Sequence, residues 1–229
     1  MKALVFDSGP IISLAMNNLL WILDPLKSRL GGEFYITPSV KKELVDRPLH
    51  IKKFEFEALQ VAKVIDDRVL ELSTNKLTKK SKELMTLANH CFTSKGKYLR
   101  IVQEAEIEIL TLAAELGTNA AVIDERTVRL LLEDAEDLRT LLEKRLHSSV
   151  QMQARNVKFI QERLGGISII RSAELATVAF SLGLFDDLIP KMQKGRALLL
   201  DAVLWGVKSN GCAITENEIE EIKKMMLST

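Results

Sequence analysis

The sequence has little cysteine, almost no net charge and no long apolar run, and each shortage excludes a class of protein. Its 2 cysteines, Cys91 and Cys212, lie far apart and outside any CxxC or Cys/His spacing. A disulfide framework or a zinc site is therefore not expected, and a reducing compartment fits best. The 32 Lys and Arg residues nearly balance 31 Asp and Glu, for a net charge of +1. That balance excludes a bulk polycation but is compatible with a local basic patch beside a binding groove.

Membrane and secretory signals are also absent from the sequence. No apolar run approaches the roughly 18 residues that a spanning helix needs, and Asp7 interrupts the basic-then-apolar layout of a signal peptide. We therefore expect a cytoplasmic protein without membrane contact. No internal repeat or low-complexity linker divides the chain, and its 47% hydrophobic and 28% charged residues are an ordinary globular balance. We expect one domain over residues 1–229.

Two short apolar runs end abruptly on an aspartate, ALVFD at residues 3–7 and AAVID at 120–124. A short continuous apolar run is typical of a buried parallel strand. Ligands of open α/β sheets bind at the carboxyl ends of such strands, so we expect Asp7 and Asp124 to lie there. Two carboxylates brought close together repel, which raises one pKa or requires a cation between them. Mg²⁺ prefers oxygen ligands and could activate water for phosphodiester hydrolysis.

Strand-like and helix-like segments alternate along much of the chain. Further strands are predicted at residues 33–37 and 166–170, and PSVKKELVD predicts a short helix that bears Glu43. Residues 102–116 predict a helix that Gly117 ends. This alternation favours the α/β class, with a parallel sheet flanked by helices.

A helical insertion at about residues 127–164 is predicted to interrupt this pattern. It carries an apolar stripe, with residues spaced roughly one turn apart: Leu131, Ala135, Leu138, Leu142 and Leu146. Such a stripe must be covered, either by folding back as a lid or by a second subunit, and we expect a homodimer. Three more helices are predicted over about residues 172–227, the last of them with a capping box of Thr215 and Glu218.

Several motifs, taken in order, give the chain a resemblance to a known family. They are VFDSGPIISL at the start, ITPSVKKEL at 36–44, AEIEILTLAAELG at 105–117, AVIDERTVRLL at 121–131 and the later SIIRSAELATVAFSLGLF. The chain resembles the PIN-domain nucleases, of the longer type seen in archaea. The resemblance implies a Rossmann-like three-layer α/β fold around a central parallel sheet. It also implies hydrolysis of RNA by Mg²⁺ or Mn²⁺ ions held between carboxylates.

The resemblance assigns the acidic site of that family to Asp7, Glu43, Asp124 and one glutamate of the helix before the last of these strands. Glu104, Glu106 and Glu108 are the alternatives for this position. Glu104 and Glu108 share one helical face, whereas Glu106 points elsewhere, and counting back from Gly117 favours Glu106. The expected catalytic and metal-binding set is Asp7, Glu43, Glu106 and Asp124.

Polar and basic residues beside these acids are candidates for binding RNA phosphates without reading bases. They are Ser8, Lys41, Lys42, Arg126, Arg129 and Arg171. Two positions depart from the family pattern. Val122 stands where many small members carry a hydroxyl residue. Arg171 stands where shorter relatives have a small residue, and it could clamp a phosphate or neutralise the acids.

Two other functions compete with a ribonuclease. One is a PIN fold that binds RNA or a protein without cutting. The other is a toxin controlled by an antitoxin, which the insertion and the C-terminal helices disfavour.

Overall fold

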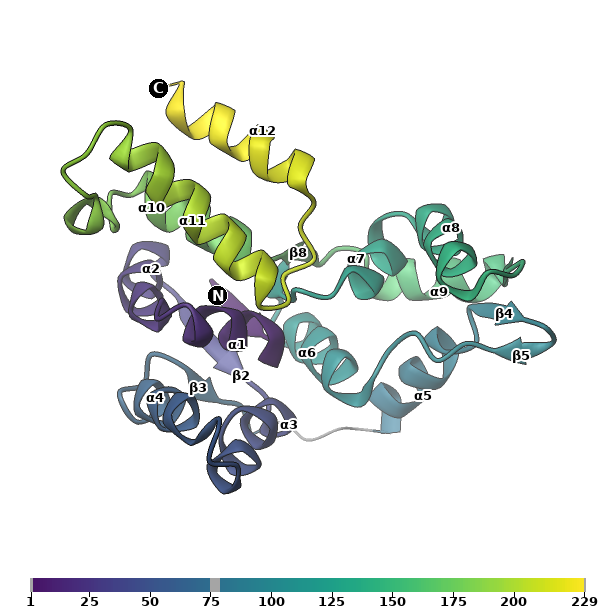
Figure 1. The fold of residues 1–229 in the computed structure, drawn as a ribbon. Coiled ribbons are helices and arrows are strands. Elements are labelled where there is room, and N and C mark those ends of the chain that lie inside the picture. The colour runs from purple at the N-terminus through teal and green to yellow at the C-terminus, as the bar shows by residue number, and fades with distance from the viewer. Residues whose placement is uncertain (1, 75–78, 229) are drawn as a thin grey trace.

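A computed structural model describes residues 2–74 and 79–228, with the side chains of residues 79 and 80 left aside. Within this range a five-stranded parallel sheet has the order β3-β2-β1-β6-β8 (Figure 1). Its strands are β1 Ala3–Phe6, β2 Glu33–Ile36, β3 Glu71–Leu72, β6 Ala120–Val122 and β8 Ser168–Ile170. The sheet confirms the α/β class and the strands that the apolar runs predict.

The strand order reverses between β1 and β6. From β1 the chain builds outward through β2 to β3, and it then returns to place β6 and β8 on the other side of β1. Phe6 is in register with Ile36 of β2 and with Val122 of β6. Clefts in open α/β sheets form where the order reverses, at the carboxyl ends of the strands. Asp7 and Asp124 follow β1 and β6 at this point.

Helices pack around the sheet in two groups. The first helix α1 contacts α4, α10 and α11, whereas α6 contacts β1, α5 and α9. The helices before the insertion are α1 Ser8–Met16, α2 Leu23–Leu30, α3 Pro38–Lys41, α4 Glu55–Asp66, α5 Lys79–Ala88 and α6 Glu104–Glu115. Gly117 follows α6 with a positive φ of 63°, as expected of a residue that ends a helix.

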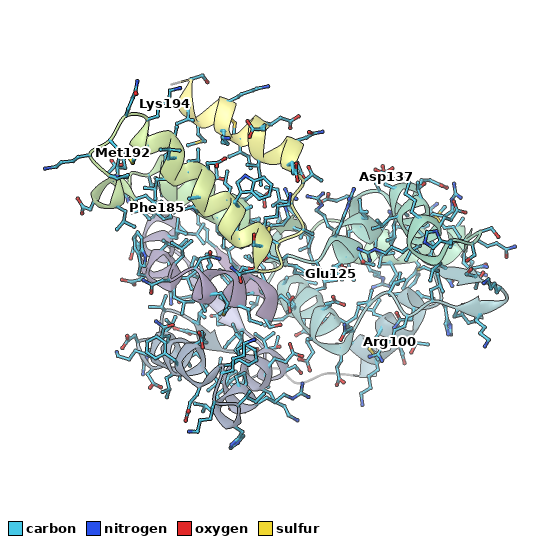
Figure 2. All side chains as sticks on the ribbon, in the orientation of Figure 1. Arg100, Glu125, Asp137, Phe185, Met192 and Lys194 are labelled. Carbon is cyan, nitrogen blue, oxygen red and sulfur yellow. The ribbon has the colours of Figure 1, made fainter. Side chains whose placement is uncertain are left out.

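The insertion projects from the edge of the sheet as a small module (Figure 1). It consists of α7 Arg126–Glu133, α8 Ala135–Leu146, β7 Gln151–Met152 and α9 Ala154–Leu164. Strand β7 pairs with the hairpin of β4 Phe92–Ser94 and β5 Lys97–Tyr98, so two distant segments build one module. In Figure 2, Glu125 lies where the insertion leaves the sheet, and Asp137 lies on α8.

Two features of the insertion differ from the expectation. The apolar stripe, whose spacing suggests a continuous helix, is interrupted at Asp134, whose side chain caps α8 by accepting a hydrogen bond from the N–H of Asp137 (2.9 Å). The apolar stripe is also covered within the chain: Leu131, Leu138 and Leu142 are buried, and only Leu146 at its end is exposed. The stripe therefore does not require a second subunit. The homodimer stays a prediction without this support.

The C-terminal segment returns to the carboxyl ends of the strands. It contains α10 Ser172–Ser181, α11 Gly195–Ser209 and α12 Glu216–Leu227, and the capping box of Thr215 and Glu218 is present. Between α11 and α12, the N–H of Ala213 donates to the carbonyl oxygen of Asp124 (3.1 Å). None of the helices within the described ranges combines the length and the apolar character needed to cross a bilayer.

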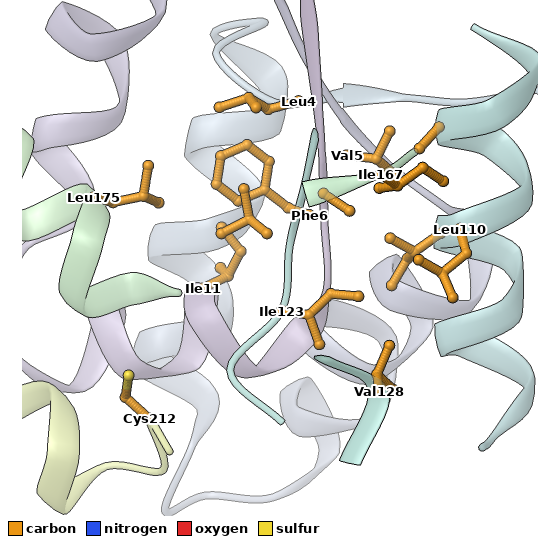
Figure 3. Close-up of a cluster of buried hydrophobic side chains, with 14 of the residues drawn as sticks. Leu4, Val5, Phe6, Ile11, Leu110, Ile123, Val128, Ile167, Leu175 and Cys212 are labelled. Carbon is orange, nitrogen blue, oxygen red and sulfur yellow. The ribbon is translucent and has the colours of Figure 1, made fainter. Parts of the chain in front are cut away.

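The core lies on both sides of β1, whose residues are all buried. Figure 3 shows its side chains between Leu110 of α6 on one side and Ile11 of α1 with Leu175 of α10 on the other. Phe6 also packs on Phe34 of β2, with ring centroids 5.0 Å apart. One buried cluster continues from here into the insertion and the C-terminal helices. Packing on both faces fixes β1, and the N–H of Asp7 continues its pairing with β6 by donating to the carbonyl oxygen of Val122 (2.9 Å).

Candidate active site

Asp7 is a nearly buried carboxylate at the start of α1, with 9% of its surface exposed. Burial raises its pKa from 3.8 to about 6, and the nearby carboxylates of Glu43 and Asp124 raise it further, while the N–H groups of Ser8 and Gly9 oppose the rise. A Cβ added at Gly9 would lie 3.5 Å from Cβ of Asp124 and 3.6 Å from Oδ2 of Asp7. Gly9, in the first turn of α1, therefore lies close to both aspartates.

Asp124 is the most strongly positioned acid of this group. Its Oδ2 accepts hydrogen bonds from Oγ of Ser13 and Oγ of Ser172 (both 2.8 Å), and its Oδ1 accepts one from the N–H of Ser172 (2.7 Å). Each carboxylate oxygen has two lone-pair sites, so only one site on Oδ1 is left for another partner. Val122 is buried in β6, so these serines supply the hydroxyl groups at this end of the sheet.

Glu43 reaches the same place from the segment after β2. It lies in a π-helical turn, Lys42–Asp46, that continues α3. Its Oε2 accepts a hydrogen bond of 2.8 Å from Oγ of Ser8, which leaves Oε1 available. Single π-helical turns inside helices are frequent at functional sites because they redirect one side chain.

Glu106 is the glutamate of α6 that faces these acids. Burial raises its pKa from 4.5 to about 7, helped by the charges of Asp7, Glu125 and Glu43 and opposed by the N–H of Gln103. That N–H donates to Oε2 of Glu106 (2.6 Å), as in a capping box. Glu104 is exposed and Glu108 is half-buried. We call Asp7, Glu43, Glu106 and Asp124 the acid cluster.

A sequence model of the PIN-domain family matches residues 3–140, from β1 into α8. The chain belongs to the PIN-domain family. The match includes every member of the acid cluster. No curated protein and no solved structure matches the chain significantly. PIN domains are in general nucleases, and they usually use divalent metal ions.

The donors of this PIN domain fit a hard divalent cation in their chemistry. All four members of the acid cluster offer carboxylate oxygens. Burial is the main cause of the raised pKa values of Asp7 and Glu106, and neighbouring acids add to it; a bound cation would oppose both effects. Within residues 2–74 and 79–228, however, no three His, Cys, Asp or Glu side chains are arranged around one point that could hold an ion. Asp7 therefore interacts electrostatically with each of the other three acids, but in the described residues they do not form a closed metal cage.

The predicted phosphate-binding residues have varied surroundings. Ser8 bonds Glu43, as described above. Lys41 pairs with Asp46 (3.0 Å), whereas Lys42 is exposed. Arg126 is half-buried at the start of α7, and its Nε is buried without a hydrogen-bond partner. Lys42 and Arg126 are thus the cations of this group with the fewest competing partners.

Two other predicted phosphate contacts, Arg129 and Arg171, belong to the packing of α12. Arg129 lies 4.0 Å from Glu218, and Arg171 lies 2.9 Å from the same carboxylate. Arg171 is 5% exposed, pairs with Glu174 and donates to the carbonyl oxygen of Ala213 (2.9 Å). These acidic partners raise its pKa above the ordinary value, although burial opposes the rise. Its guanidinium neutralises Glu174 and Glu218, so we leave Arg171 out of the proposed RNA contacts.

Some residues of the site were not expected from the sequence. Glu125 accepts hydrogen bonds from Oγ1 of Thr127 (2.7 Å) and the N–H of Val128 (3.2 Å) as the N-cap of α7, and its charge acts on Glu106. An acid one residue after the strand-ending Asp124 and just before a helix was the available signal. Ser13 and Ser172 carried only a weak signal, as single hydroxyl residues among apolar ones, Ser13 inside α1 and Ser172 at the start of α10.

Proposed function

We propose that this PIN domain is a metal-dependent endoribonuclease that hydrolyses RNA phosphodiester bonds. One observation carries the proposal: Asp7, where the strand order reverses, lies within electrostatic range of Glu43, Glu106 and Asp124 from three other segments, and Asp7 and Glu106 are buried with raised pKa values. Acids that serve only stability are usually paired with cations, which lower the pKa instead. Unpaired buried acids with raised pKa values are typical of functional sites.

The acid cluster and the serines beside it would have different roles. Asp7, Glu43, Glu106 and Asp124 would hold Mg²⁺ or Mn²⁺, which supplies activation of water and compensation of phosphate charge. Ser13 and Ser172 orient Asp124, and Ser8 orients Glu43.

The raised pKa values also predict how the site responds to pH. Asp7 and Glu106 take up or release protons near pH 6 and 7, so cation binding at these carboxylates is expected to release protons.

Lys42 and Arg126 would contact RNA phosphates near the acid cluster without reading bases. Such contacts position the strand and carry no sequence information themselves.

The test is Mn²⁺-dependent cleavage of a panel of labelled RNAs. We expect wild-type protein to cut and Asp7→Asn to lose at least about 100-fold in rate, since Asp7 would be one of the carboxylates that hold the cation and the cation would supply activation of water. Asp24→Asn removes an exposed acid of α2 and is the matched control. Equal rates for wild type and Asp7→Asn would refute the mechanism. RNA binding without cleavage by the wild type would favour a binding module.

A further inference from the structure

A polar pocket of about 390 Å³ adjoins the acid cluster on the side of the insertion. Its lining combines two acids, two arginines and four other side chains: Glu106, Glu125, Arg100, Arg145, Gln103, Thr127, Ile101 and Leu142. Glu106 is buried, whereas Arg100 and Arg145 are exposed, so the acids lie on the inner side and the arginines on the outer side. Figure 2 shows Arg100 and Glu125 where the insertion meets the rest of the chain.

The two signs of charge face this pocket without neutralising each other. Glu106 accepts a hydrogen bond from the N–H of Gln103, and Glu125 caps α7. In the described parts of the chain, neither Arg100 nor Arg145 has a carboxylate within 4.0 Å. Arg139 on the same helix α8 differs, because it pairs with Glu136 and Glu143. The guanidinium groups of these two arginines are therefore available to bind an anion from outside the chain.

Both arginines are attached to well-fixed backbone. Ile101 and Val102, directly after Arg100, donate their N–H groups to Oδ1 of Asn89 (2.8 and 2.9 Å). Arg145 lies one turn after Leu142, which is 8% exposed and holds α8 against the core. A fixed backbone places the start of each side chain, and the planar guanidinium can bond phosphate through two N–H groups.

We propose that this pocket binds the nucleotide next to the scissile linkage, with Arg100 and Arg145 on its phosphate. This inference rests on the proposed function. It adds that the RNA runs from the acid cluster into the pocket and then along the insertion. The volume lies in the range of small-ligand pockets. Arg100 and Arg145 are positioning residues, because they contact a phosphate that does not react. The insertion then contributes one wall of the substrate site.

The test uses the full chain and a labelled single-stranded RNA. Binding is measured in EDTA over a series of NaCl concentrations for wild type and for the double variant Arg100→Gln/Arg145→Gln. We expect affinity to fall at least about 10-fold, and the slope of log K against log salt to become shallower by roughly 0.7 per lost phosphate contact. In Mn²⁺, we expect KM to rise while kcat changes less than about 3-fold, because neither arginine touches the reacting atoms.

Two further variants control for charge and folding. Lys2→Gln/Arg29→Gln removes two positive charges beside the opposite, amino-terminal edge of the sheet, and it should bind RNA as the wild type does. Arg100→Lys/Arg145→Lys keeps the charge and should recover most of the affinity.

The outcomes separate the two proposals. Cleavage by wild type with unchanged binding by the double glutamine variant overturns this inference alone. RNA binding by wild type without any cleavage overturns the ribonuclease alone. If the wild type binds no RNA, both proposals fail.

Discussion

Replacing Asp7 by asparagine should stabilise the fold while it abolishes cleavage. The carboxyl of Asp7 has a pKa of about 6 in the folded chain against an ordinary 3.8. At roughly 1.4 kcal/mol per pKa unit, this difference corresponds to about 3 kcal/mol of destabilisation when the carboxylate is ionised. The asparagine side chain would keep the shape of the aspartate and an oxygen that accepts from the N–H groups of Ser8 and Gly9. The substitution would remove only the buried charge.

The sign of the effect follows from proton binding. Between pH 4 and 6 the folded state binds more protons at Asp7 than the unfolded state does, so stability falls as the pH rises through this window. The penalty is fully present above pH 6 and absent below about pH 4. Asp7→Asn should therefore gain roughly 2–3 kcal/mol at pH 8 and nothing near pH 4.

The assay is urea unfolding in EDTA at both pH values, with free energies of unfolding from linear extrapolation. Asp24→Asn, an exposed acid on α2, should change stability by less than about 0.5 kcal/mol at either pH. Mn²⁺ should raise the free energy of unfolding of wild type more than that of Asp7→Asn. A variant less stable than wild type at pH 8, or a gain that persists unchanged at pH 4, would contradict the reasoning.

Three more substitutions test other parts of the site. Glu106→Gln should be more stable than wild type at pH 8, and the difference should vanish below about pH 4.5, because burial raises the pKa of the Glu106 carboxyl to about 7. Urea unfolding at a series of pH values measures this difference in the free energy of unfolding. Ser172→Ala removes one donor to Asp124 and should cost about 1–3 kcal/mol of stability and lower kcat; unfolding and cleavage assays show both effects. Arg171→Met should leave Glu218 without its nearest cation and loosen α12, at a cost of about 1–3 kcal/mol, which limited proteolysis of the C-terminus would detect.

Local chemistry allowed much of the fold to be predicted. The apolar runs that end at Asp7 and Asp124 are strands β1 and β6, and Gly117 adopts the positive φ that ends α6. The capping box at Thr215 forms as its spacing predicts. Each of these features depends on residues within a few positions of one another. Burial pattern and capping are therefore predictable without knowledge of the rest of the chain.

The break at Asp134 shows how periodicity can hide a local capping signal. The leucine spacing continues across this residue, and periodicity alone predicts one helix. The carboxylate of Asp134 instead accepts a hydrogen bond from the N–H of Asp137 and starts α8 anew. The break lets α7 contact both α8 and α9, so the apolar stripe is buried within one chain.

The sequence by itself determined the α/β alternation, the two strand-ending aspartates and the family resemblance, because each of these depends on residues that are close together in the sequence. Spacing from Gly117 favoured Glu106, but only the tertiary structure shows that it is buried within range of Asp7 and Glu43. Tertiary structure alone decided that Ser13 and Ser172 hold Asp124 and that Arg171 serves α12. These outcomes depend on distances between segments up to 111 residues apart. Charge repulsion and burial act through space, so they appear only when the sheet brings those segments together.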